Sequence, residues 1–301
     1  MTQWSPLDRP LVSTRHLGAV LGIRREYLRE LADQAERMYS PFTLVQIKKG
    51  RRKERPIDNP LEPLKLVQTR IKRRLLDPVT LPSFMCGGVR KRSTQTNARK
   101  HVRQPEVVAL DIRKFFGSVT NNQVAEMWRA RFGASSEVVY LLTRLTTYHG
   151  HLPQGAPTST ALANLVILPG IERLYDWCRS QDMNLTIYVD DITVSGREAR
   201  RSIPVAAHAV SRAGFKLARD KVKVMPSHAR QEVTGHTVNR RLSNGRDLLK
   251  RARSMVFSAI GLSGTEDDRK RARGLVAHIC ATSPSQGRWL AEKLADASSP
   301  E

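Results

Sequence analysis

Two adjacent aspartates, Asp190 and Asp191, interrupt an apolar stretch and most constrain what this chain can fold into. Alternating apolar and polar residues at 185–189 and 192–195 predict two β-strands joined by a tight hairpin with both acids at its bend. Adjacent carboxylates beside apolar strands repel each other and are costly to desolvate unless a cation neutralises them. An isolated Asp-Asp pair is more often a plain polar turn, so a metal site needs further support.

A third acid, Asp111, stands at the end of another β-rich run at 107–112. Mg²⁺ prefers one or two carboxylates with phosphate oxygens and water, and the backbone carbonyl of Ile112 could complete the ligand set. Two such metals about 3.5–4 Å apart activate an attacking hydroxyl and stabilise the leaving oxygen of an in-line displacement at phosphorus. The pattern favours two Mg²⁺ held by Asp111, Ile112, Asp190 and Asp191.

The net charge of +23 is unevenly distributed along the chain. Residues 48–103 hold 17 Lys and Arg against 4 Asp and Glu, and residues 216–273 hold 15 against 6, while the remainder is nearly neutral. Two basic blocks around a neutral centre predict a polyanion bound on either side of an acidic working site. A compositional bias toward arginine is the alternative, but a bias alone should not cluster.

Several protein classes are excluded by composition and length. The chain of 301 residues can form roughly two subdomains. It has no apolar run near the roughly 18 residues of a membrane span, and no secretory signal at its start. Its three cysteines form no C-x-x-C pair. We therefore expect a cytoplasmic protein with no membrane partner.

The order of predicted elements indicates an α+β fold. Helical spacing predicts one or two helices over 14–39, and further helices over 64–76, 121–132, 157–178 and 206–218. Pro169-Gly170 is a candidate interruption of the helix over 157–178. Small strands are expected over 231–239 and 246–248, and two or three helices over 249–294.

Five blocks, in order, resemble the reverse transcriptases. Tyr188-Val189-Asp190-Asp191 is similar to their Y-x-D-D motif, and residues 110–116 are similar to the strand carrying their first metal-binding aspartate. The other three blocks are residues 55–76, the Q-G-x-P-x-S segment at 154–159, and 214–221. Residues 97–101 resemble the N-A-x-x-H element of bacterial retron enzymes, and 233–235 their V-T-G triplet. Val189 and Thr160 depart from the commonest residues at their positions.

The resemblance implies a right-hand polymerase fold with fingers, an antiparallel palm with helices, and a helical thumb. We expect an N-terminal helical segment at 1–47, the fingers and palm at 48–240, and a thumb that recognises RNA at 241–301.

The resemblance also implies roles for individual residues. Phe116 would exclude ribonucleotides by meeting the sugar 2′-OH, unless it is a core phenylalanine. Gln154 would contact the incoming nucleotide. Lys53 and Arg55 would bind its triphosphate, and Lys221 would give a proton to pyrophosphate unless it is a solvated surface lysine. The RNA-binding set is Asn97, His101, Val233, Thr234 and Gly235, although a lone histidine such as His101 is more often structural.

The implied function is RNA-directed DNA synthesis on a cognate structured non-coding RNA, giving a branched RNA–DNA hybrid (msDNA) from dNTPs. The implied biology is antiphage defence with a separate effector protein, since the chain leaves no room for an effector domain after residue 301. The alternatives are a group II intron-like or other bacterial reverse transcriptase, and a catalytically silent RNA-binding protein on a polymerase scaffold.

Overall fold

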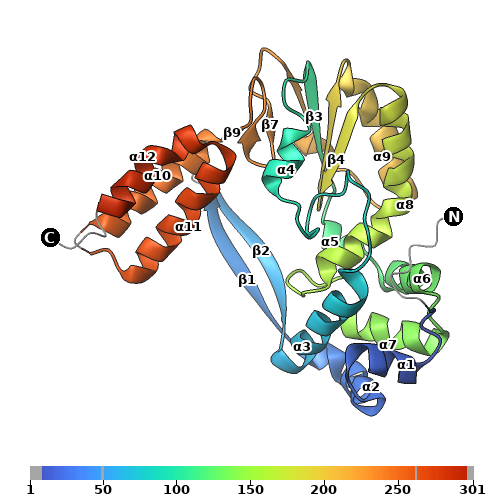
Figure 1. Ribbon diagram of the computed structural model, residues 1–301. Coiled ribbons are helices and arrows are strands. Elements are labelled where there is room, and N and C mark those ends of the chain that lie inside the picture. The colour runs from blue at the N-terminus through green and yellow to red at the C-terminus, as the bar shows by residue number, and fades with distance from the viewer. Residues whose placement is uncertain (1–8, 49–50, 262, 297–301) are drawn as a thin grey trace.

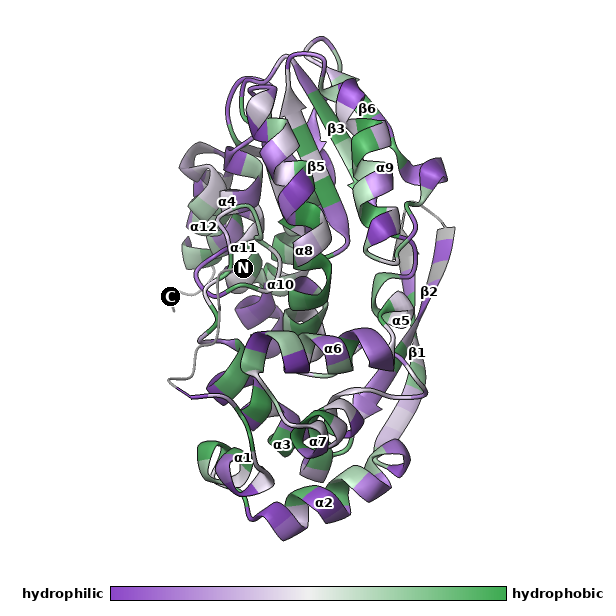
Figure 2. Cartoon of the chain, turned by 90° about the vertical axis from the view of Figure 1, so that its right-hand side faces the viewer, coloured by the Kyte–Doolittle hydropathy of each residue, from purple (hydrophilic) through white to green (hydrophobic). Residues whose placement is uncertain are grey.

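A four-stranded antiparallel sheet lies at the centre of the computed structural model, which describes residues 9–48, 51–261 and 263–296 (Figure 1). Its strand order is β4 (Asn184–Tyr188), β5 (Asp191–Gly196), β3 (Glu106–Asp111) and β6 (Lys223–Pro226). Strand β3 pairs with both β5 and β6, so it is buried in the middle of the sheet. Figure 2 shows hydrophobic stretches on β3 and β5 and on the helices around them.

Helices α8 (Ser159–Ser180) and α9 (Ser202–Arg212) lie together along one side of this sheet (Figure 1). The expected interruption of α8 at Pro169-Gly170 is wrong, because the helix continues through Pro169. Gly170 serves packing instead, since a Cβ there would lie 2.8 Å from the Cβ of Ala213. The expected helix over 206–218 ends early, at Arg212, because Gly214 turns the chain with a φ of +86°.

The predicted helices near the N-terminus are confirmed as two. Helix α1 (Thr14–Leu21) ends at Gly22, whose left-handed φ of +65° turns the chain into α2 (Arg25–Gln34) and the short η1 (Ala35–Arg37). The apolar faces of α1 and α2 join α3 (Glu62–Ile71), η2 (Lys72–Leu76), α6 (Asn121–Phe132) and α7 (Ser136–Thr146). One continuous hydrophobic core therefore runs from these helices into the central sheet.

A long two-stranded ribbon extends from this helical layer. Its strands β1 (Tyr39–Lys48) and β2 (Arg51–Pro60) pair antiparallel along their whole length. The side chains of Phe42 and Val45 on β1 are exposed. In Figure 1 the far end of the ribbon overlaps α11 in projection, whereas Figure 2 shows the ribbon and the C-terminal helices on different sides of the molecule.

The C-terminal part is a small sheet followed by three helices. Strands β7 (Glu232–Val233), β8 (His236–Thr237) and β9 (Ser243–Asn244) precede α10 (Arg246–Ile260), α11 (Glu266–Thr282) and α12 (Pro284–Asp296), which enclose a hydrophobic core of their own. The strand expected over 246–248 is wrong. Gly245 takes the N-cap position and Asp247 lies in the first turn, where a helix favours an acid.

The α+β class is confirmed by this combination of antiparallel sheets and helices. The predicted boundary at 47/48 falls inside β1, and that at 240/241 falls between β8 and β9. The division into three regions stays a prediction.

Candidate active site

Strand register brings the three predicted aspartates to one end of the central sheet. Asp111 on β3 pairs directly with Asp191 on β5, and Tyr188 on β4 pairs with Asp191. Val189 and Asp190 are therefore the two residues of the β4–β5 turn, which confirms the predicted hairpin. The Ile112 N–H donates to the Asp190 carbonyl at 2.9 Å and ties this turn to the end of β3.

The turn itself adopts an unfavourable backbone conformation. Val189 has a φ of +62°, in the left-handed region that a β-branched side chain rarely adopts. Strain of this kind persists only where the surroundings fix the backbone, and it is frequent at active sites.

Residues 85–87, which the sequence did not single out, pack against the end of β4 and the turn. Met85 forms a parallel bridge with Ile187, and the N–H groups of Cys86 and Gly87 both donate to the Ile187 carbonyl, at 2.7 and 3.2 Å. A Cβ at Gly87 would lie only 2.2 Å from the Val189 nitrogen. Position 87 therefore admits only glycine without displacing the turn.

Two side chains hold this supporting segment in place. Asn164, buried on α8, donates to the Gly87 carbonyl at 2.8 Å. Arg92 donates to the carbonyls of Leu81, Pro82 and Met85. The only signals for these contacts in the sequence were a glycine and an arginine in a basic, glycine-containing stretch, which do not specify a partner.

Electrostatics at the site follow from three carboxylates in a small volume. Burial, with a smaller contribution from Asp111, raises the pKa of Asp190 above its usual value. The Asp191 side chain keeps exposed surface, but the protein packed around it raises its pKa to about 6, with further contributions from Asp190 and Asp111. Charge that needs a cation is therefore concentrated at this end of the sheet.

Lys221 supplies one positive charge to this cluster. It lies in the short helix η4 (Arg219–Lys221), and its Nζ donates to Asp111 Oδ1 at 2.7 Å. This hydrogen bond raises the pKa of Lys221. In residues 9–48, 51–261 and 263–296, no three His, Cys, Asp or Glu side chains are arranged to hold a metal ion, and Asp111 is bound to the lysine.

Comparisons with known proteins identify the family. Residues 47–238 match the model of the reverse transcriptase (RNA-dependent DNA polymerase) family. The retron Mx65 reverse transcriptase of Myxococcus xanthus is 30% identical over 297 residues, which cover 92% of this chain and 69% of the relative. This chain belongs to the retron reverse transcriptases. It is thus an RNA-directed DNA polymerase with the right-hand fold of that family.

Other similar proteins agree with this assignment in sequence. The retron Ec86 reverse transcriptase of Escherichia coli is 26% identical over 94% of this chain and 89% of its own length. The retron Se72 enzyme of Salmonella heidelberg is 30% identical over 62% of this chain and 48% of its own. Among solved structures, a Candida albicans telomerase in complex with telomeric RNA covers 89% of this chain and 60% of its own, with a TM-score of 0.45 and 9% identity.

The other nucleotide-binding residues predicted for this reverse transcriptase lie on α5, on β2 and in the loop before α8. Phe116, on α5 (Phe115–Ser118), is half-buried, whereas Phe115 beside it is a core residue that packs on Phe215. The positive charge of Arg55 on β2 acts on Asp190. The side chain of Lys53, also on β2, lies outside the described residues.

Gln154 lies where the loop before α8 meets the ribbon. Its carbonyl accepts from the Asp58 N–H at 2.9 Å, and its N–H donates to Asp58 Oδ2 at 3.2 Å. Gly155 next to it has a φ of +133° and lies so close to Ile57 that a Cβ would approach its Cγ2 to 3.0 Å. The Q-G-x-P segment thus couples β2 of the ribbon to the start of α8.

The two retron-like elements contact each other, although 137 residues separate them. Asn97 Nδ2 on α4 (Thr94–Arg99) donates to Thr234 Oγ1 at 3.4 Å, and the Thr234 hydroxyl donates to the Thr94 carbonyl at 3.0 Å. Val233 is buried, while Gly235 is exposed with a φ of +83°. The N-A-x-x-H element therefore holds the V-T-G loop through Asn97 and Thr234.

His101 is fully buried, and both of its ring nitrogens are bonded within the protein. Nδ1 lies 2.7 Å from the Ser195 hydroxyl and Nε2 lies 2.7 Å from that of Thr186. Burial lowers the pKa of the imidazole to about 3. Of its two interpretations, structural or RNA-contacting, this placement favours the structural one.

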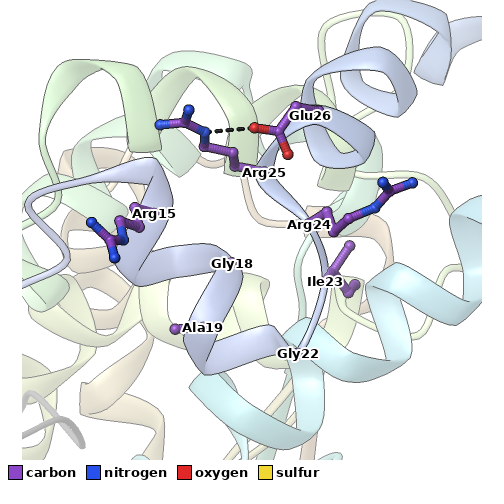
Figure 3. Close-up of a pocket in the computed structure, with 8 residues that line it drawn as sticks. All are labelled: Arg15, Gly18, Ala19, Gly22, Ile23, Arg24, Arg25 and Glu26. Carbon is purple, nitrogen blue, oxygen red and sulfur yellow. Dashed lines mark hydrogen bonds and ion pairs between the residues drawn. The ribbon is translucent and has the colours of Figure 1, made fainter.

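A separate surface hollow of about 540 Å³ lies at the turn between α1 and α2 (Figure 3). Arg15, Arg24 and Arg25 line it, and Arg25 is paired with Glu26 at 2.7 Å. It shares no residue with the aspartate cluster. Within the described residues, no helix of this reverse transcriptase is both long and apolar enough to cross a membrane.

Proposed function

We propose that this reverse transcriptase copies part of a cognate structured non-coding RNA into a branched RNA–DNA hybrid (msDNA) from dNTPs. The observation that carries this proposal is the β3–β5 register, which sets Asp111 opposite Asp191 with Asp190 in the adjoining turn. The contact between the two retron-like elements supports the subtype, because it ties the palm to the strands that precede the thumb.

Two Mg²⁺ ions are the proposed cofactors, held by the carboxylates of Asp111, Asp190 and Asp191 and the carbonyl of Ile112. The donor set fits, since oxygen ligands suit Mg²⁺. Burial and the neighbouring carboxylates raise the pKa values of Asp190 and Asp191, so a bound cation would stabilise their charged forms. The bound metals would activate the attacking hydroxyl and stabilise the leaving oxygen.

The chain's own residues orient the substrates around that centre. Phe116 presents a half-buried ring five residues beyond Asp111, where its volume would exclude a ribose 2′-OH. Gln154, fixed against Asp58, would contact the incoming nucleotide. Arg55, together with Lys53, would bind its triphosphate through charge-assisted hydrogen bonds. Lys221 would release Asp111 and give its proton to the departing pyrophosphate.

Selection of the RNA is assigned to the V-T-G loop and the helical region at 241–301. Gly235 is the exposed member of the loop, so we assign RNA contact to its backbone, and to Thr234 beside it. Asn97, His101 and Val233 are buried and would contribute by holding that loop. The proposed setting is the bacterial cytoplasm, in antiphage defence together with a separate effector protein.

The test is DNA synthesis on the non-coding RNA encoded beside the gene, with binding of the same RNA measured in parallel. We expect Asp190→Asn with Asp191→Asn to abolish synthesis and to retain RNA binding. Asp182→Asn is a matched control, because Asp182 is an exposed aspartate just before β4, at the strand's other end. Synthesis near the wild-type rate in the double variant would exclude the metal site and favour a catalytically silent scaffold.

A further inference from the structure

A lysine of the chain contacts one of the three aspartates of the site. Lys221 Nζ is 2.7 Å from Asp111 Oδ1. The Asp111 side chain is 17% exposed, whereas that of Lys221 is 50% exposed. A half-exposed lysine therefore pairs with a mostly buried carboxylate.

The backbone fixes this approach. The Ala218 N–H donates to the Asp111 carbonyl at 2.8 Å, and the Lys221 N–H donates to the Ala218 carbonyl at 2.9 Å. Leu217 forms an antiparallel bridge with Ile112 in the same segment. Because the backbone of Lys221 is tied to that of Asp111, the ion pair is built into the fold at the end of β3.

Neighbouring cations do not share this role. Lys223 on β6 acts on Asp191 through space, and Arg55 acts in the same way on Asp190. Among the described residues, Lys221 is the cation with a recorded ion pair to one of the three aspartates. An ammonium and a divalent metal on one carboxylate repel each other and both bind its oxygens, so the contact of Lys221 with Asp111 Oδ1 opposes metal binding to this side chain.

We propose that Lys221 occupies an oxygen of Asp111 in the metal-free enzyme and competes with a divalent ion for this carboxylate. This inference rests on the metal site of the proposed function. This competition weakens metal binding to the free enzyme. Metal binding to Asp111 in turn frees the Lys221 ammonium to contact the nucleotide phosphates. Lys221 is thus a positioning residue whose release from Asp111 depends on metal binding.

The test is Mn²⁺ binding to the full chain without RNA or nucleotide, measured by the loss of the free Mn²⁺ signal in electron paramagnetic resonance. Mn²⁺ is a suitable probe because it shares the oxygen ligands of Mg²⁺. We expect Lys221→Met to lower the Mn²⁺ dissociation constant by about fivefold, the upper range for a partly exposed ion pair. Lys221→Arg keeps the cation and should bind Mn²⁺ as the wild type does.

Lys223→Met is the matched control, because it removes the same charge nearby without a recorded contact to an aspartate. It should change the dissociation constant less than twofold. Unchanged binding in Lys221→Met, or an equal gain in Lys223→Met, would overturn the inference and leave the proposed function intact. If Asp190→Asn with Asp191→Asn bound Mn²⁺ like the wild type, the proposed metal site would be wrong and the inference would fall with it. Thermal unfolding of each variant verifies that it is folded.

Discussion

Gly87 and Val189 are in such close contact that a single added carbon at Gly87 would lie 2.2 Å from the Val189 nitrogen. This contact joins a loop in the first basic block to the turn that carries Asp190. The left-handed conformation of Val189 is therefore maintained by a neighbour distant in the sequence.

Gly87→Ala should displace the turn and lower DNA synthesis by about a hundredfold, because a shift of about 1 Å in reacting groups has that effect. The unfolding free energy should fall by about 1–3 kcal/mol, as for other overpacked sites. Gly117→Ala is the control, since a Cβ at Gly117 meets nothing within 4 Å. Equal synthesis rates for the two alanine variants would show that the turn does not depend on Gly87.

Asp191→Asn should stabilise the metal-free protein at pH 7. The pKa of Asp191 is raised to about 6 from 3.8, so the native state binds more protons than the unfolded state between these values. Stability contributed by this group is present below pH 4 and is lost as the pH rises through 6. Urea unfolding in EDTA should show the variant gaining over the wild type from pH 4 to 7. A constant difference across that range would contradict the shift.

His101 should produce the opposite pH dependence. Its pKa is lowered from 6.5 to about 3, so the unfolded state binds the additional proton between these values. Its contribution is intact above pH 6.5 and declines on acidification, by about 2 kcal/mol at pH 5. His101→Gln should remove this part of the dependence of the unfolding free energy on pH. His208→Gln, a control at a histidine on α9, should keep it. The idea fails if both variants retain the wild-type slope in urea unfolding.

Phe116→Ala should admit ribonucleotides while remaining folded, because the ring is half-buried beside the site. Phe115→Ala should instead cost about 3–5 kcal/mol, because Phe115 is a core residue packed against Phe215. Incorporation of rNTPs and thermal unfolding, measured on both variants, separate the two roles. Background rNTP incorporation by a well-folded Phe116→Ala protein would place the discriminating group elsewhere.

Exchange of residues 241–296 with those of a related retron enzyme should switch which structured RNA is copied, because folded RNA is recognised largely by shape and backbone contacts. The exchange leaves the Asn97–Thr234 contact and all three aspartates in place. Synthesis on a generic primed template is the control and should persist. If the original RNA preference persisted, recognition would be reassigned to the retained V-T-G loop or to the basic block at 48–103.

Local patterns in the sequence were sufficient for the β4–β5 hairpin, because alternating side chains and a two-residue gap specify a tight turn without distant partners. The same holds for the three aspartates, whose motifs are short and chemically distinctive. The N-terminal pair of helices and the C-terminal helices likewise follow from apolar periodicity. Three local errors, at Pro169, at 213–218 and at 246–248, arose where helix packing, a turn at Gly214 and capping outweighed the local signal.

Only the tertiary structure decided how the distant parts of the site meet. Spacing along the chain does not reveal that Asp111 faces Asp191, that Lys221 binds Asp111, or that Gly87 supports Val189. It also does not reveal that His101 is enclosed by Thr186 and Ser195 rather than exposed to RNA. These relationships depend on sheet register and on the burial of groups brought together from separate segments, and neither is encoded in a local pattern of residues.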